Sequence, residues 1–128
     1  MTFILDTSVA IPLRDNDRTI QAKLIALGGL QRFSAVTMVE LESGVYRTPT
    51  LAPLRRSRVD MLVNAIAVLD FTEDDARAYG AIVAASGFSR RKIVDRMIAA
   101  QALVRKATLV TLNPGDFADI PGLKLLAL

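Results

Sequence analysis

Four acidic residues, Asp6, Glu40, Asp95 and Asp116, stand where local patterns predict that a strand ends or a helix begins. If strands and helices alternate along the chain, the strand ends meet at one edge of a parallel sheet, where α/β proteins place their sites. Carboxylates gathered there without basic partners repel one another unless a cation lies between them. Oxygen ligands suit Mg²⁺ or Mn²⁺, so this set predicts a divalent-metal site.

Each acid taken alone also has a purely structural interpretation. Asp6 could cap the helix that follows it, and Glu40 could close a capping box opened by Thr37. Asp95 would favour the positive end of its helix dipole, and Asp116 could cap a short helical turn. The functional interpretation therefore depends on the four acids as a set.

The surroundings of Glu40 favour a ligand site. Ser43 and Gly44 lie three and four positions later, on the same face of the predicted helix. Their small side chains should leave room beside the carboxylate. Glu42 falls about 200° round the helix from Glu40 and is expected to face solvent.

Composition narrows the chemistry. The chain has 128 residues, of which 52% are hydrophobic, so we expect one domain spanning residues 1–128 with a sizeable core. It has no Cys and no His, which excludes disulfides, thiolate metal sites, imidazole bases and His-containing triads. Catalysis would have to use carboxylates, hydroxyls, Lys, Arg, Tyr or a metal.

Charge and hydropathy indicate a partner class and a location. The net charge is +3, from 16 basic and 13 acidic residues. If four acids surround a metal, the remaining surface is distinctly basic and favours a polyanionic partner. The start of the chain lacks a signal-peptide pattern, and no apolar run reaches about 18 residues. We therefore expect a cytoplasmic protein without a membrane span.

Strands and helices alternate along most of the chain, which predicts an α/β fold with a mainly parallel sheet. The expected strands are Thr2–Leu5, Arg32–Val36, Ala67–Phe71, Leu109–Thr111 and Lys124–Leu128. The expected helices are Thr7–Leu13, Thr19–Leu27, Thr37–Tyr46, Leu51–Asn64, Thr72–Ala85 and Lys92–Ala107. Pro12 is expected to help end the first helix. An apolar set on the fourth helix is expected to be core rather than a surface for an antitoxin or a dimer partner: Leu51, Leu54, Met61, Leu62 and Ile66.

Short segments spread over nearly the whole chain resemble one family. They are Ile4-Leu5-Asp6-Thr7-Ser8, Ser34 to Glu40-Leu41 with Gly44, Asp95 with Ile98-Ala99-Ala100 and Ala102, Leu109 to Asn113 with Asp116-Phe117, and Ile120-Pro121-Gly122-Leu123. In these the chain resembles PIN-domain proteins, in particular the VapC ribonuclease toxins of bacterial type II toxin–antitoxin systems. The resemblance implies a PIN-like fold and Mg²⁺- or Mn²⁺-dependent endoribonuclease activity. It also implies tRNA or rRNA targets, a neutralising VapB-type antitoxin and a homodimer.

The resemblance assigns the metal-binding and catalytic roles to Asp6, Glu40, Asp95 and Asp116. Relatives differ at the last position, so the fourth role falls to Asp116 or is shared with Asn113. Many relatives carry a Gly-x-Pro-Ile-like stretch before the third acid. This chain has Gly87-Phe88-Ser89-Arg90-Arg91-Lys92-Ile93 instead, so the resemblance does not extend to substrate choice.

The expected chemistry is metal-assisted hydrolysis of phosphodiester bonds. A bound metal lowers the pKa of its water and neutralises charge on the phosphate. Candidate supporting polar residues are Thr7, Ser8, Thr111 and Asn113. Candidate contacts to RNA phosphates are Arg90, Arg91, Lys92 and Arg96, whereas a second cluster, Arg55-Arg56-Arg58, is expected to be a solvated face.

Two alternatives stay open at this point. A receiver-like or nucleotide-binding module would also gather acids at strand ends. However, the chain lacks both glycine-rich phosphate motifs, and Asp70, at the third strand, has no paired acid near the first strand. A catalytically silent PIN-like binding protein would keep the fold without the activity. Metal-dependent RNA cleavage that is lost in Asp6→Asn separates the enzyme from both.

Overall fold

Five strands form one sheet in which every neighbouring pair is parallel, in the order β3-β2-β1-β4-β5. The computed structural model describes all 128 residues, Met1–Leu128. The strands are β1 (Thr2–Leu5), β2 (Leu30–Ser34), β3 (Val68–Leu69), β4 (Thr108–Thr111) and β5 (Lys124–Ala127). The helices are α1 (Thr7–Arg14), α2 (Arg18–Leu27), α3 (Ala35–Arg47), α4 (Ala52–Ala65), α5 (Glu73–Ser86) and α6 (Ile93–Arg105). The predicted α/β architecture is confirmed.

The strand order creates a switch point beside β1. The chain builds outward from β1 to β2 and β3, then crosses to the other side of β1 to place β4 and β5. Leu5 lies opposite Val110 in the β1–β4 pair, and the amide of Asp6 donates to the Val110 carbonyl at 3.0 Å. In open α/β sheets, sites form where the strand order reverses in this way.

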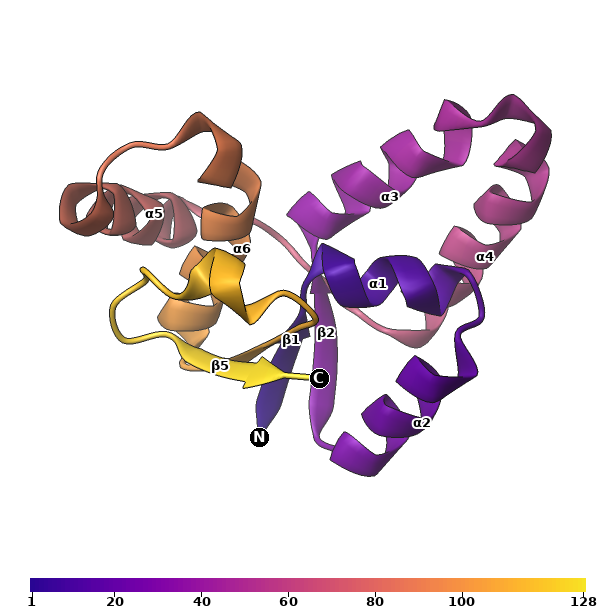
Figure 1. The fold of residues 1–128 in the computed structure, drawn as a ribbon, viewed down its shortest axis with the longest axis horizontal. Coiled ribbons are helices and arrows are strands. Elements are labelled where there is room, and N and C mark those ends of the chain that lie inside the picture. Colours follow the sequence, from indigo (N-terminus) through magenta and orange to yellow (C-terminus); the bar gives the residue numbers. More distant parts are fainter.

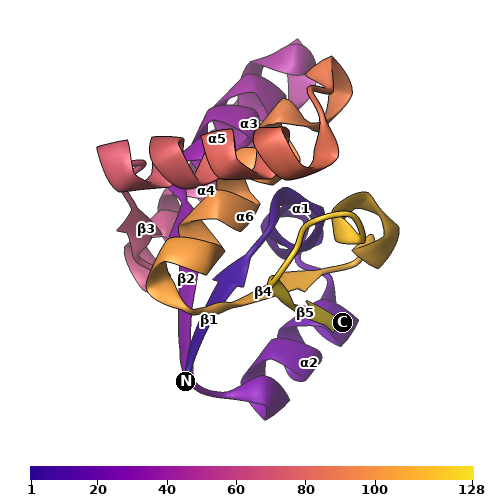
Figure 2. The same ribbon diagram turned by 90° about the vertical axis from the view of Figure 1, so that its left-hand side faces the viewer.

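Alternation along β1 divides the core between the two faces of the sheet. Phe3 and Leu5 pack into a cluster with side chains of α1, α2 and α3, whereas Ile4 packs into a second cluster with α5 and α6. Figure 1 shows α1 and α2 on one side of the sheet and α5 and α6 on the other, and Figure 2 shows α5 lying across α6. Fully burying one such apolar side chain contributes about 1.5–3 kcal/mol, so both layers are firmly attached.

Helices α3 and α4 form a hairpin that projects beyond the sheet (Figure 1). Val59 is the one fully buried residue of α4. The expectation that the apolar residues of this region are core is wrong for three of them: Leu51, Leu54 and Met61 are exposed. Leu62 and Ile66 do pack against the core. A hairpin that extends past the sheet buries only the side that meets α1, which periodicity alone does not reveal.

Several predicted boundaries differ from the structure by one or two residues, and two of the differences have a visible physical reason. α1 continues through Pro12 to Arg14, because the buried side chains of Val9 and Leu13 on either side of the proline hold that segment against the core. α3 begins at Ala35 rather than Thr37, because the Ser34 hydroxyl accepts from the Val36 amide at 2.9 Å and caps the helix earlier.

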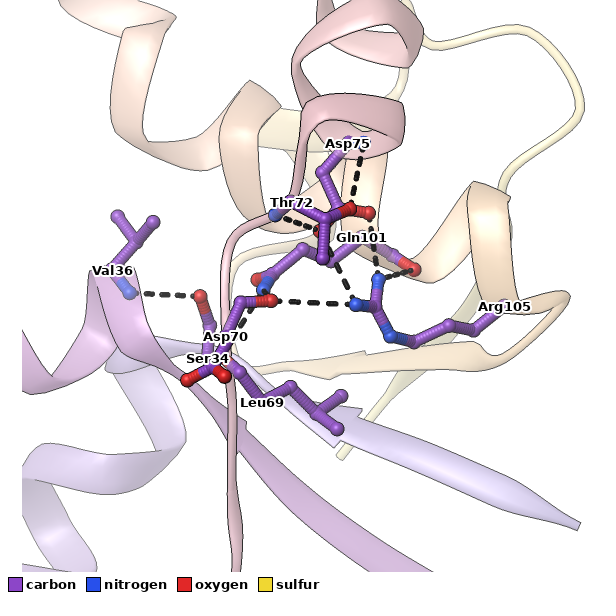
Figure 3. Close-up of polar contacts among 8 residues, drawn as sticks. All are labelled: Ser34, Val36, Leu69, Asp70, Thr72, Asp75, Gln101 and Arg105. Atoms are coloured by element: carbon purple, nitrogen blue, oxygen red, sulfur yellow. Dashed lines mark hydrogen bonds and ion pairs between the residues drawn. The ribbon is translucent and has the colours of Figure 1, made fainter.

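A buried polar network fastens α6 to the end of β3 and the start of α5 (Figure 3). The Asp75 side chain is fully buried and pairs with Arg105 at 2.7 Å, while its second oxygen accepts from the Thr72 amide at 2.8 Å. Gln101 donates to the carbonyls of Leu69 at 3.3 Å and Asp70 at 3.1 Å. The network fixes the position of α6 on the sheet.

None of the six helices combines the length and the apolar character that crossing a bilayer requires.

Candidate active site

Asp6 lies at the switch point, between the end of β1 and the start of α1. Its side chain is only 3% exposed. One carboxylate oxygen accepts from the Ser8 hydroxyl at 2.5 Å, and the other accepts from the Thr111 hydroxyl of β4 at 2.6 Å. Burial raises the pKa of Asp6 above its ordinary value, and these hydroxyl bonds offset part of the rise. Asp6 also accepts from the Val9 amide at 3.3 Å, so it caps α1 as well as facing the site.

Glu40 reaches the same edge from the second turn of α3. The Thr7 hydroxyl donates to the Glu40 carboxylate and lies 3.1 Å from the hydroxyl of Thr37. Because α3 is capped by Ser34, Thr37 stands inside the helix and no capping box involves Glu40. Thr7 therefore links α1 to α3 and holds Glu40 towards the end of β1.

Asp95 is half-buried in the first turn of α6, and its pKa is raised to about 6. Burial is the largest cause, followed by repulsion from Asp116, Asp6 and Glu40 in that order. The other three predicted acids therefore lie near enough to Asp95 to act on its charge. The positive charge of Lys92 lowers the pKa of Asp95, but it offsets only part of the rise.

Asp116 lies in the short 3-10 turn Pro114–Phe117 after β4 and is exposed. Asn113 precedes this turn, and its side chain does not cap it. The backbone N–H of Asn113 donates to the Thr111 hydroxyl at 2.9 Å. Both side chains stay free for a ligand, so the choice between them for the fourth role stays open.

The charges of these four acids are not neutralised within the protein. Seven ion pairs occur in the chain, and none includes Asp6, Glu40, Asp95 or Asp116. Buried or crowded carboxylates without a cation are costly. An all-oxygen donor set with excess negative charge fits Mg²⁺ or Mn²⁺.

The side chains do not form a closed cage as they stand. No group of three or more acidic residues is arranged so that it could already hold an ion. Asp6 and Glu40 both direct oxygens to neighbouring hydroxyls. The fit to a metal therefore rests on donor chemistry and mutual repulsion rather than on a preformed geometry.

The four basic residues just before α6 and in its first turn divide into two pairs. Arg96 is 2% exposed and donates to the Gly87 carbonyl at 2.5 Å and to Asp119 at 3.1 Å. Lys92 also pairs with Asp119, at 3.0 Å. Arg96, which the sequence suggested as an RNA contact, is thus buried and bonds to Gly87 and Asp119 within the protein. Lys92 forms an ion pair with the same aspartate. Arg90 and Arg91 are exposed and unpaired.

The space predicted beside Glu40 is partly filled. A Cβ atom at Gly44 would lie 2.9 Å from Nη1 of Arg14, so the glycine accommodates that guanidinium. Ser43 donates to the Val39 carbonyl at 3.0 Å. Sequence reasoning missed Arg14 because nothing local connects it with α3.

Comparison with known proteins agrees with this geometry. Residues 3–123 match the family described as the PIN domain. The chain belongs to the PIN-domain family. Among PIN-domain relatives it is 26% identical to ribonuclease VapC2 of Rickettsia felis over 132 residues, which covers 98% of this chain and 96% of the relative.

Solved structures show the same PIN-domain fold. DNA-bound VapBC from Salmonella typhimurium matches with a TM-score of 0.86 and 26% identity, over 99% of this chain and 98% of that one. VapBC-1 from nontypeable Haemophilus influenzae matches with a TM-score of 0.78 and 27% identity, over 99% and 98% of the two chains.

The raised pKa of Asp95 gives a prediction for the metal-free protein. Unfolded Asp95 ionises near 3.8 and folded Asp95 near 6, so the folded state loses stability as pH rises between these values. Asp95→Asn removes this penalty. After allowance for solvent screening of a half-exposed group, the variant should be about 1–2 kcal/mol more stable above pH 6.

Thermal unfolding of both proteins in EDTA, from pH 4 to pH 8, measures this difference. The advantage of Asp95→Asn should shrink as the pH falls towards 4, because the folded wild-type carboxyl is then protonated and the unfolded one is partly protonated. A variant that is equally or less stable at pH 7 would contradict the mutual repulsion of the four acids.

Proposed function

We propose that this PIN-domain chain is a divalent-metal-dependent endoribonuclease and the toxin of a VapBC-type toxin–antitoxin pair. The observation that carries the proposal is a set of four unpaired carboxylates near the switch point. Repulsion from the other three contributes to the raised pKa of Asp95. Its similarity to a ribonuclease VapC2 and to toxins in VapBC complexes supports the reaction and the partner.

Asp6, Glu40, Asp95 and Asp116 would hold Mg²⁺ or Mn²⁺, with Asn113 as the alternative at the fourth position. When bound, the ion supplies a water of lowered pKa and neutralises charge on the phosphate. The chain's own hydroxyls prepare this site. Ser8 and Thr111 orient both oxygens of Asp6, and Thr7 orients Glu40. Ligands held in this way lose little freedom on binding.

The basic surface supports RNA as the polyanion. Exposed Arg90 and Arg91 directly precede the helix that carries Asp95, and so lie where a strand entering the site would pass. A VapB-type antitoxin, a homodimer and a tRNA or rRNA target are predictions from the family resemblance, and a cytoplasmic location is the prediction from charge and hydropathy along the sequence.

Cleavage of total RNA by the purified, antitoxin-free protein tests the proposal. We expect new RNA ends with Mg²⁺ or Mn²⁺, none after metal removal with EDTA, and recovery when the metal is added back. Equal cleavage in EDTA would contradict metal dependence. No cleavage with either metal would favour a catalytically silent PIN-like module.

A further inference from the structure

A polar groove of about 520 Å³ runs between α1, α3 and α4 beside the candidate active site. Two of its ten lining residues are hydrophobic. Three arginines contribute to its wall, Arg14 from α1, Arg47 from the end of α3 and Arg55 from α4. Thr7 and Glu40 belong to the same wall, so the groove is continuous with the carboxylate site.

Two of the three arginines of this groove, Arg47 and Arg55, form no ion pair. Arg47 is exposed and forms no ion pair, and Arg55 donates only to the Gly44 carbonyl, at 2.9 Å. Arg56, the chain neighbour of Arg55, instead pairs with two acids, Glu42 and Asp60. The two adjacent arginines of α4 therefore differ. Arg56 faces acids of the same chain, whereas Arg55 lines the groove.

Arg14 is built into the groove rather than lying loosely on its surface. Its side chain is 6% exposed and pairs with Asp15 through Nε at 3.0 Å and Nη2 at 3.1 Å. Its third nitrogen, Nη1, donates no hydrogen bond within the protein and lies against Gly44. Glycine inside a helix costs roughly 1 kcal/mol relative to alanine, and here it leaves space for that guanidinium.

We propose that this groove binds a backbone phosphate of the RNA strand next to the phosphate that is cleaved. The proposal rests on the proposed function, because it takes Glu40 to mark the position of the scissile bond. Guanidinium groups match phosphate oxygens as paired donors. The groove lining has no aromatic side chain that would stack a base. Only Ile11 and Val39 among its ten residues are hydrophobic, so its mainly polar and basic chemistry fits the RNA backbone.

Salt dependence of RNA binding tests this groove. A fluorescent single-stranded RNA is titrated with the cleavage-deficient Asp6→Asn protein, and with the same protein carrying Arg47→Ala/Arg55→Ala, at several salt concentrations with Mg²⁺ present. Losing this phosphate contact should flatten the slope of log K against log[salt] by about 0.7. Affinity in moderate salt should fall at least about tenfold.

Arg56→Ala is the matched control, since it removes a neighbouring arginine that faces Glu42 and Asp60; its slope should equal that of the parent. In the cleavage-competent protein, the double variant should raise KM more than it lowers kcat, because the contact is the same in ground and transition states. Unchanged unfolding temperature establishes that the effect is not misfolding.

The outcomes separate this inference from the proposed function. If the wild type cleaves RNA, and Arg47→Ala/Arg55→Ala changes neither the salt slope of Asp6→Asn nor the KM of the wild type, the groove assignment is overturned and the nuclease stands. If the double variant binds RNA normally but binds its antitoxin more weakly, the groove takes an acidic protein segment instead. If the wild type does not cleave RNA and Asp6→Asn does not bind it, both fail together.

Discussion

Asp6→Asn should lower kcat/KM for RNA cleavage by at least about 100-fold, because it would remove a charged ligand from the divalent ion that the proposed site would hold. The substitution keeps one side-chain oxygen as an acceptor for the helix cap, so the fold should persist. The loss should appear chiefly in kcat, since it concerns charge that develops during the reaction.

Cleavage of a defined RNA under saturating Mg²⁺ measures this effect. Asp74→Asn is a suitable control, because Asp74 is an exposed acid in the first turn of α5 and forms no ion pair. It should retain wild-type activity. An Asp6→Asn protein within a factor of three of wild type would remove Asp6 from the catalytic centre.

Arg105→Ala should destabilise the fold by about 3 kcal/mol, the lower end of the range for breaking a buried ion pair. Asp75 would stay fully buried without its cation, and α6 would lose one of its hydrogen bonds to the segment that follows β3. Burial alone would raise the pKa of Asp75, but hydrogen bonds from Arg105 and Thr72 outweigh it and leave the pKa below its usual value.

Urea unfolding of the metal-free protein gives the free energy of this change. Arg77→Ala provides the control on α5, because Arg77 forms an exposed i,i+4 pair with Glu73 in which both side chains are more than 70% exposed. That pair should contribute no more than about 0.5 kcal/mol. Equal losses in the two variants would show that the Asp75–Arg105 pair adds nothing beyond a surface contact.

The periodicity of apolar residues and the positions of Gly and Pro were sufficient to predict the alternating strands and helices of the fold. The apolar run before Asp6 and the long helical pattern after Lys92 become β1 and α6 with boundaries close to those expected. Strand β3 shrinks to two residues, because only Val68 and Leu69 pair with β2. Its length depends on where the neighbouring strand ends, which local sequence does not record.

In the candidate site, too, features set by neighbouring residues could be predicted, whereas contacts between residues far apart in the sequence could not. Asp6 could be predicted because its junction is local, between a strand and the helix that it caps. The bond from Thr7 to Glu40 joins residues 33 positions apart, and Arg96 finds Asp119 after 23 positions. Such pairings arise from packing, so the sequence suggested Arg96 for RNA although the folded chain uses it internally.

Mapping RNA ends in cells most directly tests whether the four-acid site is a ribonuclease centre. Wild type and Asp6→Asn/Asp95→Asn are induced to equal protein levels without antitoxin, growth is followed, and new RNA 5′ ends are sequenced. A metal-dependent ribonuclease toxin predicts growth arrest and discrete new ends with the wild type alone. Indistinguishable growth and RNA ends in the two cultures would contradict it.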